Sequence, residues 1–311
     1  MKLGLQIPDF TWPGGAEKLG PTLATIAKTA DEAGFDSIGV MDHFFQIGNI
    51  GPPEHEMLEA YTTLGFLAAH SKRAKLMTVV TGVHYRHPGI LAKIVTTLDV
   101  LSGGRAWLGI GAAWNEAESR GLGVPFPSLK ERFEMLEETL EICLQMWSGD
   151  EKPYQGKHHQ LERPLNSPQS LSRPHPGILI GGSGEQKTLR LVAKFADACN
   201  LWPTPELPRK LEVLRAHCEA VGRNYDEIEK TAIFRFDIGE KGEKVDALIE
   251  QLHWMAGVGV ETVIGSMADV WRINPLEIMG ERVIPAVAKL EATGSRAHMK
   301  RSSLPTHTPL P

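Results

Sequence analysis

The sequence predicts a (β/α)8 TIM barrel with insertions. Eight short apolar segments alternate with eight segments of helical periodicity, and glycine or proline separates most of them. The 311 residues, 42% of them hydrophobic, suit one barrel of about 250 residues with insertions better than two domains. A doubly wound open sheet is the alternative fold. It would need a GxGxxG turn after the first strand, where this chain has QIPDFTWPGG.

The first half of the chain supplies four strands and four helices. The strands are expected at 3–7, 37–41, 76–80 and 106–110, and are apolar as buried parallel strands are. The helices are expected at 18–33, 58–70, 88–101 and 132–147, each with an apolar face. Pro88 suits a first helical position, and Ser102, Gly103 and Gly104 end that helix because glycine adopts the left-handed conformation readily.

The second half repeats the pattern. Strands are expected at 178–180, 198–201, 231–236 and 261–264, and helices up to 195, then at 208–221, 244–255 and 269–290. The aperiodic segments at about 112–130 and 149–177 are insertions, with a hairpin expected around 154–161. We therefore expect a single domain over 1–294. Residues 295–311 are polar, rich in proline and aperiodic, which predicts a disordered tail.

Charge and composition restrict the class of protein. A formal charge of −5 argues against a nucleic-acid or anionic-membrane partner, since either requires clustered lysine and arginine. The three cysteines form no CxxC pair, which argues against a disulfide framework and against a zinc site. No apolar run approaches the roughly 20 residues of a membrane span. These features predict a cytoplasmic protein without a metal site.

Barrel enzymes carry their chemistry just after the strands, so the polar residues there are the candidates for an active site. Asp42 and His43 follow the second strand, and an imidazole can act as acid or base near neutrality. The alternative is that Asp42 caps backbone amides while His43 only packs. After the fourth strand, Gly111 admits close approach of a flat ligand and Asn115 and Glu116 offer polar groups, although Glu116 also fits an exposed carboxylate at a helix start.

A glycine-rich turn after the fifth strand predicts an anion site. Gly181, Gly182, Ser183 and Gly184 lead directly into a helix, with Lys187 in its first turn. Bare backbone amides at a helix N-terminus bind phosphate well, and Lys187 would add a positive charge.

One stretch of the chain carries a family resemblance. Between residues 86 and 116 the motifs RHP, LAK, TLD, LSGGR, LGIGAAW and NE follow one another in order. With them the chain resembles the bacterial luciferase-like family of flavin and deazaflavin oxidoreductases, most closely the branch that uses coenzyme F420. The resemblance extends from Leu3 to about Leu290.

The resemblance implies roles for the candidates. Asp42 and His43 would lie beside the cofactor ring, with His43 acting on the substrate as acid or base, and Glu116 would serve as a proton donor. The match to Gly82 and Val83, after Thr81, implies a non-prolyl cis peptide that presses against the back of the ring. The other cofactor-binding positions implied by the match are Thr81, Gly111, Ala113, Asn115, Gly181, Gly182, Ser183, Gly184 and Lys187.

The function that the resemblance implies is hydride transfer between C5 of F420 and a small organic substrate, in a protein that forms a homodimer. FMN in place of F420 would instead give a monooxygenase. A metal-dependent barrel hydrolase or isomerase using Asp42, His43, His84 and His87 is an alternative of another class, disfavoured because no HxH follows the first strand. A barrel that binds flavin without catalysis is the fourth possibility. The sequence leaves open whether the substrate is a sugar phosphate, an alcohol, a quinone or an unsaturated ketone.

Overall fold

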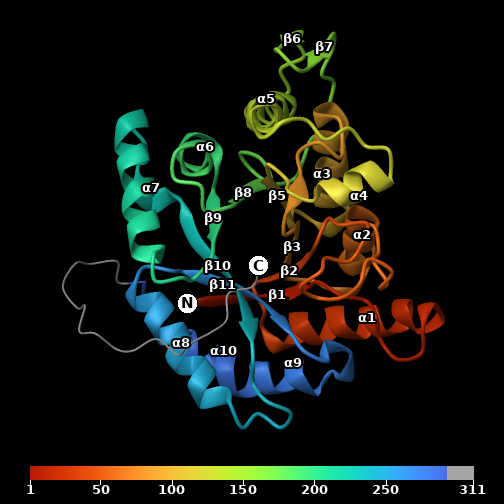
Figure 1. The fold of residues 1–311 in the computed structure, drawn as a ribbon, viewed down its shortest axis with the longest axis vertical. Helices are drawn as coiled ribbons and strands as arrows, with labels where there is room; N and C mark the ends of the chain where they lie inside the picture. The colour runs from red at the N-terminus through yellow and green to blue at the C-terminus, as the bar shows by residue number, and fades with distance from the viewer. Residues whose placement is uncertain (293–311) are drawn as a thin grey trace.

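A computed structural model describes residues 1–292, and the tail expected at 295–311 lies outside the described residues. Eight parallel strands form a closed ring, with pairing between β3 and β5 completing it. In Figure 1 the strands surround a common centre and the helices lie outside them. The predicted (β/α)8 barrel is confirmed, and the open sheet is excluded. The barrel strands are β1 (Lys2–Ile7), β2 (Ser37–Val40), β3 (Lys75–Thr78), β5 (Ala106–Gly111), β8 (Gly177–Gly181), β9 (Ala198–Leu201), β10 (Glu229–Phe236) and β11 (Thr262–Met267).

The outer helices follow the predicted apolar faces. Glycine in the left-handed conformation ends α1, α3, α5 and α7, as expected for helix C-termini. His87 caps α3, with Pro88 at its first position, and its ring accepts a hydrogen bond from the Gly89 amide. The helices are α1 (Ala16–Ala33), α2 (Ala60–His70), α3 (Pro88–Ser102), α5 (Leu129–Ser148), α6 (Thr188–Phe195), α7 (Leu207–Val221) and α8 (Val245–Gly257).

Two helices differ from their predictions by more than two residues. Helix α5 begins at Leu129, three residues before the expected start, because Ser128 and Glu131 form a reciprocal capping box. The expected helix at 269–290 is divided into the short helix η2 (Val270–Arg272), α9 (Asn274–Ile278), the π-helical turn η3 (Met279–Val283) and α10 (Ile284–Val287). Pro275 and Pro285 lie in the first turns of α9 and α10, where a missing amide is tolerated.

The insertions lie outside the ring of strands. The predicted hairpin is confirmed as β6 (Tyr154–Gln155) paired antiparallel with β7 (Gln160–Leu161), beyond α5 in Figure 1. The amides of Lys157, His158 and His159 donate to Glu138, which attaches the hairpin to α5. The other insertion contains the short helix α4 (Glu116–Gly121), and Arg132 anchors it by donating to the Ala112 carbonyl at 2.8 Å and the Pro127 carbonyl at 2.5 Å.

The largest hydrophobic core lies between the strands and the helices, and a small cluster around Met77, Leu179, Ala198 and Ile264 fills the barrel interior. The three cysteines are buried free thiols, and burial raises the pKa of Cys143 and Cys199 to about 12. No helix within residues 1–292 combines the length and the apolar character needed to cross a bilayer.

Candidate active site at the carboxyl ends of the strands

The third strand ends earlier than predicted and continues as a bulge. The peptide between Val79 and Val80 is cis, and Thr81–Gly82 (β4) then resumes pairing with β5. The expected cis peptide between Gly82 and Val83 is therefore wrong: the non-prolyl cis bond lies three residues earlier. Thr81 and Gly82 are committed to pairing with Ile110 and Gly111, and the Val83 amide donates to the Gly111 carbonyl.

The bulge fills spaces that glycines leave in three neighbouring strands. A Cβ on Gly39 would lie 2.6 Å from Val79 Cγ2, and a Cβ on Gly111 or Gly181 would lie 3.1 or 3.0 Å from a Val80 methyl group. Val79 and Val80 thus pack against β2, β5 and β8 together, over the barrel interior. The result is an apolar surface at the barrel mouth, between the strand that leads to His43 and the glycine-rich turn after β8.

Asp42 lies in a buried ion cluster. Arg86 donates to both of its carboxylate oxygens, at 2.5 and 3.0 Å, and also to Glu59 at 2.5 Å. Burial raises the pKa of Asp42, and the hydrogen bonds from Arg86 oppose that shift. Thr81 is also buried, and its hydroxyl is hydrogen-bonded to Tyr61 and Thr78. The side chains of Asp42 and Thr81 are thus held by hydrogen bonds within the protein.

His43 is held by a carboxylate that the sequence analysis did not single out. Its Nδ1 lies 2.8 Å from Oε2 of Glu118, and its ring meets Trp114 edge-on with 5.5 Å between ring centroids. The His43 side chain is 15% exposed, whereas Glu118 is fully buried. Burial alone would raise the pKa of Glu118, but hydrogen bonds from His43, Phe44 and Tyr85 hold it below its ordinary value.

Glu116 lies apart from this contact. Its side chain is half exposed and pairs with Arg120 on the same helix, at 2.6 Å. Asn115 caps α4: its side chain accepts from the Glu118 amide and donates to Oε2 of Glu118. Ala113, with a φ of 61°, turns the chain between β5 and α4. The structure therefore brings Glu118, and not Glu116, next to His43.

His84 fixes the other side of α4. The Ser119 hydroxyl donates to the Asn115 carbonyl at 3.1 Å, so it accepts from Nε2 of His84 at 2.7 Å. Nδ1 of His84 is buried without a partner within residues 1–292. Burial, assisted by the charge of Arg132, lowers the pKa of His84 to about 4, so its imidazole is neutral at pH 7.

The turn after β8 has the free donors expected of an anion site. The Gly182 amide donates to the Asn200 carbonyl, whereas no amide of residues 183–187 donates to an acceptor in the described part of the chain. The Ser183 hydroxyl oxygen is likewise buried without a partner there. Consecutive free amides before a helix form a concavity that suits a phosphate or carboxylate group.

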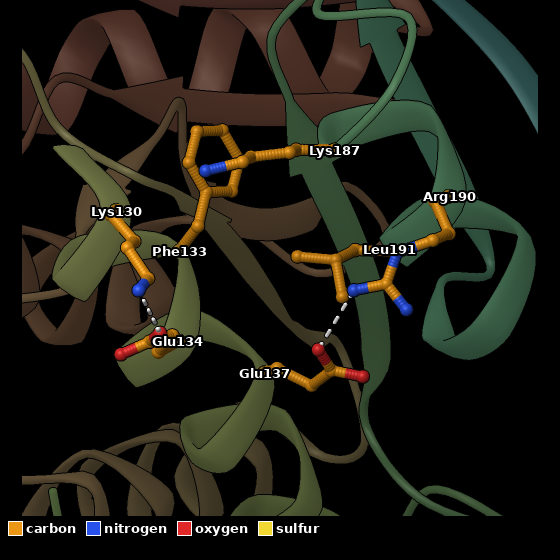
Figure 2. A pocket seen from close by; sticks show the side chains of 7 residues that line it. All are labelled: Lys130, Phe133, Glu134, Glu137, Lys187, Arg190 and Leu191. Carbon is orange, nitrogen blue, oxygen red and sulfur yellow. Dashed lines mark hydrogen bonds and ion pairs between the residues drawn. The ribbon is translucent and has the colours of Figure 1, made fainter.

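The Lys187 side chain lies against α5. Its ammonium stands 5.1 Å from the ring centroid of Phe133, and both residues line a cavity of about 230 Å³ between α5 and α6. Figure 2 shows the side chain extended toward that ring. On the walls of the same cavity, Glu134 pairs with Lys130 and Glu137 pairs with Arg190.

Comparison with known proteins places this geometry in a family. The model of the family described as luciferase-like monooxygenase matches residues 1–298. The chain belongs to the luciferase-like monooxygenase family. Two family relatives are named F420-dependent glucose-6-phosphate dehydrogenase. The one from Nakamurella multipartita is 31% identical over 79% of this chain and 72% of its own length. The one from Amycolatopsis mediterranei is 32% identical over 75% of this chain and 70% of its own length.

Solved structures show the same fold at lower sequence identity. Coenzyme F420 dependent tetrahydromethanopterin reductase from Methanopyrus kandleri superposes with a TM-score of 0.74 at 19% identity, over 91% of this chain and 98% of that one. The monooxygenase RslO1 from Streptomyces bottropensis superposes with a TM-score of 0.77 at 20% identity, over 92% of this chain and 99% of that one. The luciferase-like fold thus occurs in both a deazaflavin enzyme and a monooxygenase.

Sequence reasoning missed Glu118, Arg86 and Tyr85. A signal for Glu118 was present, because Asn115 followed three residues later by glutamate resembles a capping pattern that turns that glutamate toward the helix start. Arg86 and Tyr85 carried no such signal. No group of three or more His, Cys, Asp or Glu side chains within residues 1–292 is arranged to hold a metal ion.

Proposed function

We propose that this chain is a coenzyme F420-dependent oxidoreductase that transfers a hydride between C5 of the deazaflavin and a small organic substrate. The observation that carries the proposal is the arrangement around the Val79–Val80 bulge. The apolar surface formed by Val79 and Val80 packs against β2, which leads to His43, and against β8, which leads to the free amides of residues 183–187. Relatives named F420-dependent glucose-6-phosphate dehydrogenase, at 31% and 32% identity, favour F420 as the ring.

Each part of the site would have one task. The valine side chains of the bulge would contact one face of the ring and keep water from it, and the amides after β8 would hold the phosphate. The bound cofactor supplies the hydride chemistry. His43, exposed at the mouth and fixed through Nδ1, would move the accompanying proton at Nε2.

An FMN-dependent monooxygenase is the second candidate, and the description of the family model and the resemblance to RslO1 favour it. A fluorescence titration of purified protein with F420 and with FMN decides between them. We expect F420 to bind at least about ten times more tightly, a difference of about 1.4 kcal/mol. Equal affinities, or tighter binding of FMN, would refute the assignment.

The anion site is tested separately by Ser183→Ala, which removes the unpartnered hydroxyl. We expect the affinity for F420 to fall at least about tenfold, as for the loss of one hydrogen bond to a charged group. The affinity for a deazaflavin that lacks the phosphate should not change. An equal loss for both ligands would place the phosphate elsewhere.

The homodimer and the cytoplasmic location remain proposals. Light scattering of the purified protein tests the first, and fractionation of the source cells tests the second.

A further inference from the structure

Glu118 accepts hydrogen bonds from three groups other than His43. Its Oε1 accepts from the Phe44 amide at 3.0 Å and the Tyr85 hydroxyl at 2.7 Å. Its Oε2 accepts from the Asn115 amide group at 2.9 Å and contacts Nδ1 of His43 at 2.8 Å. Three donors thus occupy three of the roughly four lone-pair positions of a carboxylate. The pKa of Glu118 lies below its ordinary value, so Glu118 is ionised and only accepts.

This arrangement decides the tautomer of His43. Because Glu118 only accepts, the hydrogen of a neutral His43 ring must be on Nδ1, which leaves the lone pair on Nε2. Trp114 packs edge-on against the ring and restricts its rotation. Nε2 is thus the one ring atom that is free to exchange a proton with a ligand at the barrel mouth.

Among residues 1–292, Glu118 is the one carboxylate in contact with His43, while neighbouring Asp42 is paired with Arg86. Burial and Glu118 raise the pKa of Tyr85, and the lowered pKa of His84 keeps that ring neutral. Arg132 is bound to backbone carbonyls, and Glu116 is paired with Arg120 at the surface.

We propose that Glu118 is the positioning residue of the active site, and that it sets the Nδ1–H tautomer of His43 and stabilises the imidazolium formed when Nε2 takes a proton. The catalytic part of this inference rests on the proposed function, whereas the tautomer does not. Glu116, the glutamate that the family resemblance favours in this loop, has no part in it.

The test uses Glu118→Gln in cofactor-free protein labelled with ¹⁵N-histidine, with the His43 signals identified by their loss in His43→Gln. We expect Nδ1–H to be the dominant neutral form in the parent protein. In Glu118→Gln the Nε2–H tautomer should become substantially populated, because the glutamine amide group can donate to Nδ1 as well as accept from it. An unchanged tautomer would overturn the proposal.

Kinetics separate positioning from folding. In Glu118→Gln we expect kcat to fall at least about 100-fold while the dissociation constant of F420 changes less than threefold, with the acid limb of the pH profile shifted to lower pH. Tyr85→Phe removes one of the four hydrogen bonds but keeps the charge, so it should retain the tautomer and most of kcat. Glu212→Gln, an exposed change on α7, is the matched control for loss of a carboxylate.

The outcomes are distinguishable from failure of the proposed function. If F420 does not bind the parent protein, the proposed function is wrong and the labelled histidine still reports on Glu118. If F420 binds and turns over but Glu118→Gln retains kcat, the positioning role is wrong. If Tyr85→Phe loses as much kcat as Glu118→Gln, the Tyr85 hydroxyl and not the charge of Glu118 controls His43, which also overturns the positioning role.

Discussion

Replacing Arg86 by methionine should lower the free energy of unfolding, because Arg86 is the cation of the ion cluster that contains Asp42 and Glu59. Arg86 makes three charge-assisted hydrogen bonds, two to Asp42 and one to Glu59, and its guanidinium lies 4.7 Å from the Tyr61 ring centroid. The Asp42 side chain is 1% exposed, so water cannot replace these partners. Removing one member of a buried ion pair typically costs about 3–5 kcal/mol, because a charge remains buried without compensation.

The pH dependence provides a second readout for Arg86→Met. Burial already raises the pKa of Asp42 with Arg86 in place, and without the guanidinium it should rise further above the value of about 3.9 in the unfolded chain. As the pH rises above about 3.9, Asp42 then loses its proton in the unfolded chain before it does so in the folded protein. The destabilisation caused by Arg86→Met therefore grows as the pH rises. We therefore expect a larger loss of unfolding free energy at pH 8 than at pH 5.

Urea denaturation of the parent, Arg86→Met, Asp42→Asn and the double variant measures the effect as a double-mutant cycle. We expect a coupling energy of at least about 1.5 kcal/mol, since the double variant leaves no fully buried charge unpaired: Glu59 also loses Arg86, but its side chain is 37% exposed. Arg163→Met is the matched control: it breaks an exposed pair with Glu151 and should cost less than about 1 kcal/mol. A loss below about 1 kcal/mol for Arg86→Met at pH 8, or one that does not depend on pH, would refute the reasoning.

Three further predictions follow from close contacts and from one shifted pKa. Gly109→Ala should fail to give folded protein in an expression and circular-dichroism assay, because its Cβ would lie 1.8 Å from the Thr78 carbonyl oxygen; a native spectrum would contradict this. Gly39→Ala, with a Cβ 2.6 Å from Val79, should cost about 1–3 kcal/mol in urea denaturation and weaken F420 binding, and unchanged affinity would show that the bulge does not support the ring. Since the folded-state pKa of His84 is about 4 and its ordinary value is 6.5, the unfolded chain binds the proton first, so the unfolding free energy should fall by about 1–3 kcal/mol as the pH drops from 6.5 to 4. In His84→Phe the unfolding free energy should fall less between pH 6.5 and pH 4. If the variant and the parent show the same dependence of unfolding free energy on pH, His84 is not the cause of the fall.

The fold could be predicted because its signals are local. Alternating apolar segments, Pro88 at a helix start and left-handed glycines such as Gly103 and Gly149 each act within a few residues. The position of the cis peptide was predicted wrongly, because contacts between residues distant in sequence determine the backbone conformation there. The bulge at Val79 and Val80 depends on glycines in β2, β5 and β8, which no short window contains together.

The candidate site was predicted in part for the same reason. His43 could be located from its place after a strand, because the carboxyl ends of barrel strands face a common mouth. Its partner was indicated only by the capping pattern of Asn115 and Glu118, since Glu116 and Glu118 belong to one six-residue helix. The packing of that helix against Tyr85 and Phe44 decides which of the two is buried.

The valine bulge and its glycines also limit how the site can be redesigned. Val79 and Val80 occupy the room that Gly39, Gly111 and Gly181 leave, so a Cβ at Gly39 would press on Val79 and a Cβ at Gly111 or Gly181 would press on Val80. Shortening the valine at the same time relieves that pressure. A bulkier cofactor is accommodated most directly by shortening Val80, which touches two strands without belonging to either. Libraries that vary these positions one at a time would miss such compensated pairs, whereas libraries that vary a glycine and its valine together would include them.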